Sequence, residues 1–132
     1  MTAETTNVLE FSLGDGRYCI DIAHVDEIVD ATEEITPVPD ADDHIVGVVD
    51  LRGETTRVVD PKVSLDLDAD RTGRRIVVLS DQDGTGLLID DVHQVEDVRT
   101  EDVDTSLASE RTRGVIRRDD RFVVWIDPAA LV

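Results

Sequence analysis

The stretch Gly47-Val-Val-Asp-Leu-Arg-Gly53, which continues to Val58-Val-Asp-Pro61, decides the fold of this 132-residue chain. Apolar residues lie on both sides of a glycine-containing turn, and this pattern predicts a β-hairpin that ends at the proline, where one helical turn can begin. The same pattern returns as Gly114-Val-Ile116 and Trp125-Ile-Asp-Pro128, and the two fifteen-residue stretches align without a gap. The sequence therefore predicts an internal repeat.

The rest of the chain is also rich in strand signals. Valine, isoleucine and threonine supply 41 of the 132 residues, and β-branched residues favour strands. Turn signals at Gly14-Asp-Gly16 and at Asp83-Gly84 predict two further hairpins. A short helix over residues 22–29 is also expected, because Val25, Ile28 and Val29 recur at helical spacing, with Glu27 on the exposed side.

The repeat predicts one domain, residues 1–132, made of two units at about residues 7–66 and 74–132. Each unit is too small to bury a robust core by itself, so we expect the two to share a hydrophobic seam. Short strands with closely spaced turns favour small barrels, because a barrel hides the edges of its sheet. The predicted architecture is mainly β, with two small barrels side by side and a few short helices.

The charge balance excludes several classes of partner. The chain has 13 Lys and Arg against 31 Asp and Glu, a formal net charge of −18, whereas nucleic acids and anionic membrane surfaces are bound through basic residues. No apolar run is long enough for a membrane span or an export signal, so we expect a cytoplasmic protein without direct membrane insertion. Aspartate outnumbers glutamate and Lys62 is the single lysine, a composition that indicates a halophilic source.

A search for reactive residues favours a protein without catalytic activity. The run Asp66-x-Asp68-x-Asp70 has calcium-loop spacing but lacks the glycine and glutamate that such a loop needs, so residues 66–73 are interpreted as a polar connection. The three histidines have no His or Cys at ligand spacing, and Cys19 is expected to be a buried hydrophobe. We expect no metal and no cofactor. A small hydrolase with a site at the barrel junction is the alternative, which a histidine clustered with cysteine or carboxylate in a concave pocket would favour.

A rigid β scaffold without an evident reactive site is suited to recognition. Val25 and Ile28 on the predicted helix are candidate contact residues, as is Arg52 at the tip of a glycine-flanked turn. The plainer interpretations stay open: the two apolar residues pack onto their own barrel, and the arginine is solvated.

Seven segments, in a specific order and spacing, carry a resemblance to a known family: Phe11-Ser-Leu-Gly-Asp-Gly-Arg-Tyr-Cys-Ile-Asp-Ile22, Val25-Asp-Glu-Ile28, Ile35-Thr-Pro-Val-Pro39, Gly47-Val-Val-Asp-Leu-Arg-Gly53, Val58-Val-Asp60, Gly86-Leu-Leu-Ile-Asp90 and Gly114-Val115. Over nearly its whole length the sequence resembles the CheW family, the adaptors of bacterial and archaeal chemotaxis. Together with the composition, the resemblance predicts a halophilic archaeal source.

The resemblance implies a fold, a function and a set of contact residues. The fold is two five-stranded, SH3-like β-barrels that share a hydrophobic seam. The function is a non-enzymatic scaffold that couples the cytoplasmic tips of methyl-accepting chemoreceptors to the regulatory domain of the histidine kinase CheA, recruited to receptor arrays at the inner face of the membrane and monomeric when free. The positions that it marks for receptor and kinase binding are Val25, Glu27, Ile28, Gly47, Leu51, Arg52 and Gly53, of which the two glycines match turns that demand glycine.

Three residues depart from the family pattern. Asp50 stands where asparagine is usual, Arg57 where proline is usual, and Pro61 where leucine is common. These departures put local loop geometry in question, and with it the choice of partner. A CheW-like adaptor for another kinase pathway, such as pilus or twitching control, therefore stays open as an alternative.

The charge generates a prediction about salt. Eighteen uncompensated negative charges on a small body repel one another, and the screening length falls from about 8 Å in physiological salt to about 3 Å at 1 M. We expect the folded circular dichroism signal to be retained in molar KCl and lost progressively as the salt is diluted. Full stability without salt would contradict this expectation.

Overall fold

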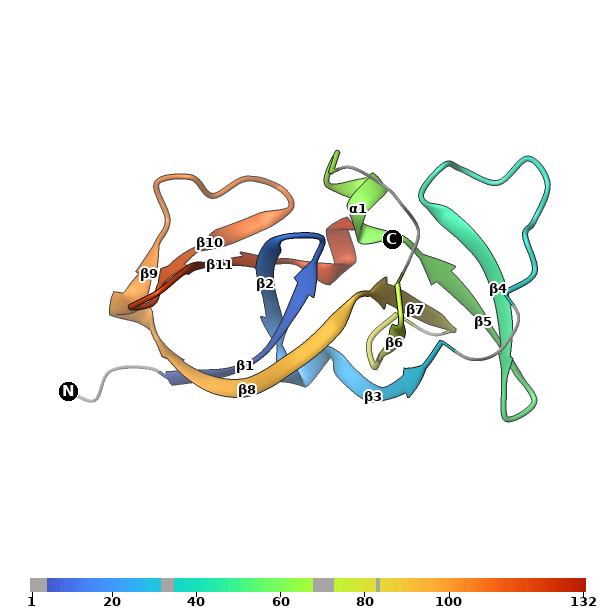
Figure 1. Ribbon diagram of the computed structural model, residues 1–132, viewed down its shortest axis with the longest axis horizontal. Helices are drawn as coiled ribbons and strands as arrows, with labels where there is room; N and C mark the ends of the chain where they lie inside the picture. Colours follow the sequence, from blue (N-terminus) through green and yellow to red (C-terminus); the bar gives the residue numbers. More distant parts are fainter. Residues whose placement is uncertain (1–4, 32–34, 68–72, 83) are drawn as a thin grey trace.

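The computed structural model describes residues 5–31, 35–67, 73–82 and 84–132, and these form two β-sheets that lie side by side (Figure 1). The six strands of the first sheet are, in spatial order, β8 (Asp91–Arg99), β1 (Thr5–Leu13), β2 (Gly16–Asp21), β11 (Phe122–Ile126), β10 (Thr112–Arg117) and β9 (Val103–Asp104). The five strands of the second sheet are β3 (Val25–Asp30), β6 (Arg75–Leu79), β7 (Thr85–Ile89), β5 (Glu54–Val59) and β4 (Ile45–Leu51). The helical segments within the described residues are one turn each: η1 (Ile22–His24), α1 (Pro61–Ser64), η2 (Thr100–Asp102) and η3 (Pro128–Ala130).

The prediction of a mainly β protein with a few short helices is confirmed. In place of the two five-stranded barrels expected, the described strands form two sheets whose edge strands do not pair to close a barrel, and the two-residue strand β9 gives the first sheet a sixth member. The polar connection predicted at 66–73 is described only at its ends, because residues 68–72 lie outside the described residues. The turn predicted at Asp83-Gly84 is likewise described only in part.

The helix predicted over residues 22–29 is wrong. Asp21 caps a single helical turn, its carboxylate accepting a hydrogen bond from the Ala23 amide at 2.9 Å. The chain then enters β3, which pairs antiparallel with β6 and alternates half-buried and exposed residues. Ile28 and Val29 therefore lie on opposite faces of a strand. The spacing of Val25, Ile28 and Val29 is compatible with a helix, but branched side chains fit a pleated surface better. Pairing with β6 therefore favours the strand.

Each sheet draws its strands from both halves of the chain. The hairpin β1–β2 pairs with β8 and, in parallel, with β11, although it precedes both by most of the chain length. The hairpin β6–β7 pairs in the same way with β3 and, in parallel, with β5. Neither half can complete a sheet by itself, a feature that we call the hairpin exchange. The division into units at about 7–66 and 74–132 stays a prediction, but it cannot correspond to one separate barrel per unit.

The aspartate and proline that end each repeated hairpin have the same role in both places. The carboxylates of Asp60 and Asp127 accept hydrogen bonds from the amides of Lys62 and Ala129, at 3.0 and 3.1 Å. The intervening proline occupies the first position of the turn in each case. Pro61 is thus compatible with the fold, because proline suits the first turn of a helix.

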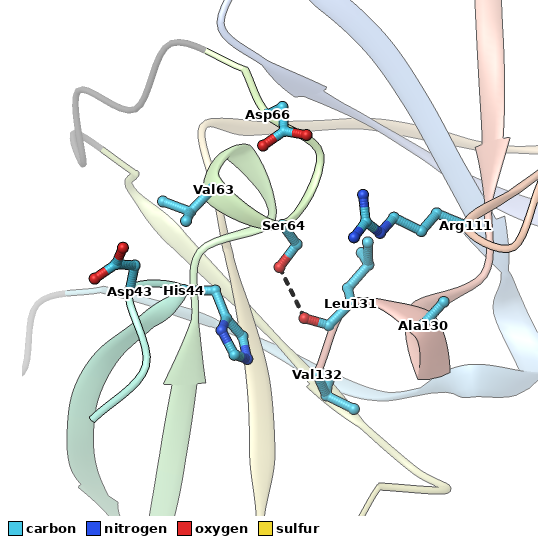
Figure 2. Close-up of a pocket in the computed structure, with 9 residues that line it drawn as sticks. All are labelled: Asp43, His44, Val63, Ser64, Asp66, Arg111, Ala130, Leu131 and Val132. Carbon is cyan, nitrogen blue, oxygen red and sulfur yellow. Dashed lines mark hydrogen bonds between the residues drawn. The ribbon is translucent and has the colours of Figure 1, made fainter. Parts of the chain in front are cut away.

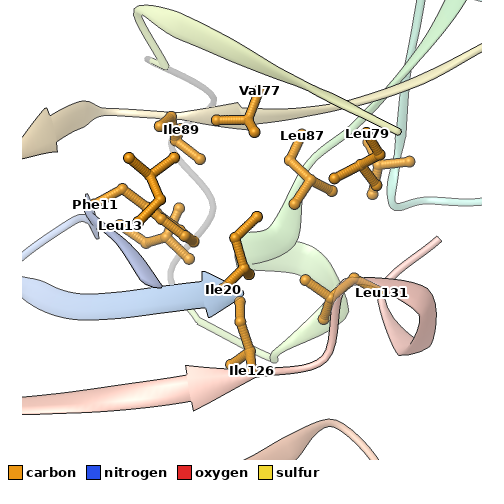
Figure 3. Packing of buried hydrophobic residues seen from close by; sticks show 11 residues of the cluster. Phe11, Leu13, Ile20, Val77, Leu79, Leu87, Ile89, Ile126 and Leu131 are labelled. Atoms are coloured by element: carbon orange, nitrogen blue, oxygen red, sulfur yellow. The ribbon is translucent and has the colours of Figure 1, made fainter. Parts of the chain in front are cut away.

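The core lies between the two sheets. Figure 3 shows apolar side chains of β1, β2 and β11 packed against those of β6 and β7. Its buried members, which we call the central cluster, are Leu9, Phe11, Leu13, Ile20, Val59, Val77, Leu79, Leu87, Ile89, Ile126 and Leu131. Each sheet also carries a smaller apolar cluster, separate from the central cluster. Buried Cys19 belongs to the smaller cluster of the first sheet.

A charged network fills one end of the first sheet. Glu10 of β1 has a fully buried side chain, and its carboxylate accepts hydrogen bonds from Arg121 Nε and Nη2 at 3.0 and 2.8 Å and from Arg17 Nη1 at 2.6 Å. Beside it, Glu96 of β8 lies 3.5 Å from Arg118. Burial alone would raise the pKa of Glu10, but the bonds from the two arginines outweigh it and lower that pKa to about 2. Burial has the larger effect on Glu96, whose pKa is raised.

The network predicts an acid-dependent contribution to stability. A carboxylate with a lowered pKa stabilises the folded state above its unfolded pKa of about 4.3 and loses this effect as pH falls toward 2. The variant Glu10→Gln removes the buried counter-charge of the half-buried Arg17 and Arg121, of which Arg121 keeps its surface partner Asp120. We therefore expect it to lower the free energy of unfolding near neutral pH by about 2 kcal/mol. Urea unfolding at constant molar KCl should show that the difference shrinks between pH 4.5 and 2.

The exposed variant Glu101→Gln serves as the control, because Glu101 pairs with Arg99 at the surface. It should change the stability by less than about 1 kcal/mol at every pH. A Glu10→Gln variant as stable as the wild type near neutral pH would contradict the role given to this network.

Candidate functional site

The β4–β5 hairpin presents Arg52 on a strained turn. Leu51 pairs with Glu54, which leaves Arg52 and Gly53 as a two-residue loop. Both have positive φ, 53° and 85°, as in the type I′ turns that suit the twist of a hairpin. The carboxylate of Asp50 accepts a hydrogen bond from the Gly53 amide at 2.8 Å. An aspartate can thus satisfy this turn as an asparagine would, and the departure at position 50 leaves the turn intact.

The strain at Arg52 is not explained by the contact that its side chain makes. A non-glycine residue held in the left-handed region costs about 1–3 kcal/mol, and asparagine or glycine would be the usual choice. The Arg52 guanidinium forms an ion pair with Glu27 of β3, but 75% of the arginine side chain is exposed. An exposed pair of this kind contributes at most about 1 kcal/mol. An arginine retained at such a position points to a role outside the fold.

A hollow of about 210 Å³ lies beside this turn. Its lining residues come from β3, β4, β5, β6 and the turn: Asp26, Glu27, Leu51, Arg52, Glu54, Thr56 and Val78. Thr56 and Leu51 form apolar and hydroxyl surface, while carboxylates and the Arg52 guanidinium border the opening. The hollow therefore offers charged groups of both signs around a small uncharged floor.

The place equivalent to this hollow in the first sheet is occupied by the Glu10 network, as the strand registers show. Glu10 pairs with Cys19, which pairs with Trp125, whereas in the second sheet Val78 pairs with Gly86, which pairs with Val58. Val78 thus stands where the first sheet has Glu10. The gapless alignment of the repeated hairpins likewise sets Glu54 against Arg121. Among the described residues, the second sheet therefore has no ion pair equivalent to that of Glu10 and Arg121, because the corresponding residues are Val78 and Glu54.

The structure brings together only part of the predicted contact set. Glu27, Leu51 and Arg52 line the hollow, and Gly53 lies in the turn beside them. Val25 is half-buried against the central cluster. Ile28 is 36% exposed on the other face of β3. The predicted residues therefore occupy two faces of the second sheet, not one.

Gly47 is buried and does not lie in a turn, contrary to the expectation. It sits in β4 beside a register shift, where a Cβ would overlap the backbone carbonyl of Thr36. Thr36 and Val48 exchange two backbone hydrogen bonds, at 2.8 and 2.9 Å, across this position. Glycine here lets the segment around Thr36 approach β4 closely. Its contribution is to the shape of the strand that carries Leu51 and Arg52.

The hollow also contains four residues that were not selected from the sequence. Asp26, Glu54, Thr56 and Val78 became candidates only through their position. For Glu54 and Thr56 a signal existed, because they follow the turn directly and alternate along β5. For Val78 there was none, since the hairpin exchange brings it from a distant part of the chain.

A second pocket addresses the possibility of a hydrolase. It has a volume of about 330 Å³ and its lining includes Asp43, His44, Ser64 and Arg111 (Figure 2). A nucleophilic serine must hydrogen-bond to its base, but the Ser64 hydroxyl donates to the main-chain carbonyl of Leu131 at 2.8 Å. In the part of the chain that the structure describes, no three or more His, Cys, Asp or Glu residues gather into a metal site. The pocket thus groups His44 with Asp43 and Asp66, as the hydrolase alternative expects, but its serine hydroxyl is bonded to the main chain and does not form a serine–histidine pair.

The calcium-like spacing at residues 66–70 involves Asp68 and Asp70, which lie outside the described residues. Within the described ranges, no helix has the length and apolar character needed to cross a membrane.

The strain in the Arg52-Gly53 turn predicts how substitutions of Arg52 change the stability of the fold. Asparagine tolerates the left-handed region better than arginine, so we expect Arg52→Asn to keep or raise the free energy of unfolding, by up to about 1 kcal/mol. Arg52→Ala removes the same ion pair without relieving the strain and should be the less stable of the two. Thermal unfolding followed by circular dichroism measures both, and an asparagine variant clearly less stable than the wild type would show that the arginine itself holds the hairpin.

Comparisons with known proteins agree with this fold. The family model described as CheW-like domain matches residues 7–132. A probable chemotaxis protein CheW of Rhizobium etli is 28% identical over 133 residues, covering 94% of this chain and 85% of its own length. Chemotaxis protein CheW of Rhizobium meliloti is 30% identical over 129 residues, covering 91% of this chain and 83% of its own. Among solved structures, scaffolding protein TtCheW from Thermoanaerobacter tengcongensis superposes with a TM-score of 0.80 at 25% identity, covering 94% of this chain and 90% of that one. With these matches over nearly its whole length, the chain belongs to the family of CheW-like domains.

Proposed function

We propose that this protein is a non-enzymatic adaptor of chemotaxis, which couples the cytoplasmic tips of methyl-accepting chemoreceptors to the regulatory domain of a CheA-type histidine kinase. It acts in the cytoplasm, at receptor arrays on the inner face of the membrane. The names of its relatives support this role, since they are chemotaxis proteins and the similar solved structure is that of a scaffolding protein.

The observation that carries the proposal is the strained arginine beside the hollow. Glu27, Leu51, Arg52 and Gly53 present charged and apolar groups on a short, hydrogen-bonded hairpin. Arginine is enriched among the residues that dominate the energy of protein interfaces. A rigid turn loses little conformational freedom when a partner binds, which leaves more of the contact energy available as affinity.

An adaptor also needs its two contact surfaces in a fixed relation. The outer face of β3 carries Ile28 away from the hollow, and an amphipathic helix of a receptor tip can lay apolar side chains against such a face. Val25 and Gly47 support the strands that carry these surfaces. In high salt, long-range charge attraction is screened, so apolar contacts and close arginine hydrogen bonds supply the affinity.

Affinity purification in molar KCl tests the proposal. The tagged protein, expressed in its own cells, should recover a CheA-type kinase and chemoreceptors. We expect Arg52→Ala and Ile28→Asp each to weaken recovery of at least one partner by roughly tenfold or more, a loss of about 1.4 kcal/mol. Val25 is left unchanged because its half-buried side chain packs on the central cluster.

Arg75→Ala is the matched control. Arg75 lies in the same sheet and pairs with Asp30 of β3 at 3.1 Å, with 46% of its side chain exposed, but it lies outside the hollow. It should leave both partners bound. Recovery of a different histidine kinase would assign the adaptor to another pathway, and unchanged binding by both Arg52→Ala and Ile28→Asp would refute the site.

A further inference from the structure

A different hollow lies in the first sheet, between the ends of β1, β8, β10 and β11. It has a volume of about 250 Å³. Val98, Val103 and Trp125 form an apolar wall that continues into the buried cluster of that sheet. Around this wall stand the hydroxyls of three threonines and one guanidinium, contributed by Thr6, Thr100, Thr105 and Arg113.

The charge of this hollow is unusual for so acidic a chain. Three other hollows, two of them described above, each include at least one aspartate or glutamate in their linings, but the described lining of this one includes none. The neighbouring carboxylate, Asp104, accepts hydrogen bonds from the amide and hydroxyl of Ser106 at 2.9 and 2.7 Å. In a chain with 31 acidic residues, the described lining of this hollow thus carries one cationic side chain and no carboxylate.

Arg113 supplies that charge. Its guanidinium carbon lies 4.5 Å from the centroid of the Trp125 ring, a cation–π contact that holds the group over the aromatic face. No carboxylate of the described residues forms an ion pair with it. A cation–π contact leaves the edge of the guanidinium, with its N–H groups, available to accept a bidentate anion.

Trp125 adds an unsatisfied donor. Only 7% of the residue is exposed, and its indole Nε1 is buried without a hydrogen-bond partner among the described residues. A buried donor without an acceptor costs about 1–3 kcal/mol. Because that nitrogen is shielded, the groups that the hollow offers to a ligand are the Arg113 guanidinium, threonine hydroxyls and the apolar wall.

From this juxtaposition we propose that the hollow binds a small organic monocarboxylate with a short aliphatic chain. The carboxylate lies against the Arg113 guanidinium and the threonine hydroxyls, and the aliphatic chain lies against Val98, Val103 and the Trp125 ring. The volume is below the 300–1,000 Å³ of pockets that hold drug-sized ligands, so a short chain fits and a long one does not. This site is separate from the Arg52 hairpin and does not depend on the proposed adaptor role.

The single tryptophan of the chain makes the proposal directly testable. The ¹⁵N-labelled full-length protein has one indole N–H resonance, which can be followed while sodium butyrate replaces chloride at constant molar ionic strength. We expect a saturable shift with a dissociation constant of about 1 mM, together with a saturable change in tryptophan fluorescence. Butyramide, which has the same shape without the charge, should bind at least about tenfold more weakly.

Variants of two arginines on β10 provide the matched comparison. Arg113→Gln removes the charge and should weaken butyrate binding roughly tenfold or more, whereas Arg113→Lys keeps the charge and should retain most of it. Arg117→Gln changes an arginine that stacks on Phe122 outside the hollow and should leave binding unchanged. Far-UV circular dichroism confirms that each variant is folded.

Three results would overturn the proposal: no saturable shift, equal shifts with butyrate and butyramide, or equal loss in the Arg113→Gln and Arg117→Gln variants. The second result would indicate an apolar cavity only, and the third a general response to charge.

Discussion

The hairpin exchange is the constraint on which the rest of this structure depends. Because β1–β2 completes the sheet of the second half, and β6–β7 completes that of the first, the two halves of the chain cannot separate without breaking strand pairs in both sheets. The central cluster is buried by the same arrangement, since its side chains come from strands of both sheets. The relative orientation of the sheets is therefore set by this shared apolar cluster and by the short connections from β2 to β3 and from β7 to β8. A protein that must hold two partners in a fixed relation gains that rigidity from its topology, without a large domain.

Once the scaffold is fixed, a few substitutions at equivalent positions make its two ends different. In the first sheet Glu10 and Arg121 meet and fill the interior with a buried ion pair. In the second sheet Val78 and Glu54 stand in their places, and a hollow opens beside Arg52. A buried ion pair requires both partners, because either charge left alone is costly. The second sheet has neither partner at these positions, so no unpaired charge is buried there and the end of the sheet can hold a hollow.

The sequence was sufficient for the local parts of this structure. The sequence predicted the turns at Gly14-Asp-Gly16 and Arg52-Gly53 and the aspartate–proline ends of the repeated hairpins. This was possible because the type of a turn depends on residues that are adjacent in the sequence. The helix expected at residues 22–29 failed because Val25, Ile28 and Val29 satisfy helical and strand patterns alike, and pairing with β6 decided between them. The hairpin exchange left no local signal, since pairing between distant strands depends on the whole fold. The site followed the same division: Arg52 could be selected from its turn, whereas Val78 could not.

The two hairpin turns of the N-terminal half allow one more step. At the turn between β1 and β2 the positive φ, 60°, falls on Gly14, where it costs little. At the turn between β4 and β5 the corresponding strain falls on Arg52, in a chain with 22 aspartates and 8 glycines. The ordinary residues for such a turn are thus plentiful in this composition and are used elsewhere. Glu27 does not explain the exception, because an exposed ion pair offsets only part of the strain. Stability alone thus gives no reason for an arginine at this position, whereas the contact with a partner proposed above would supply one.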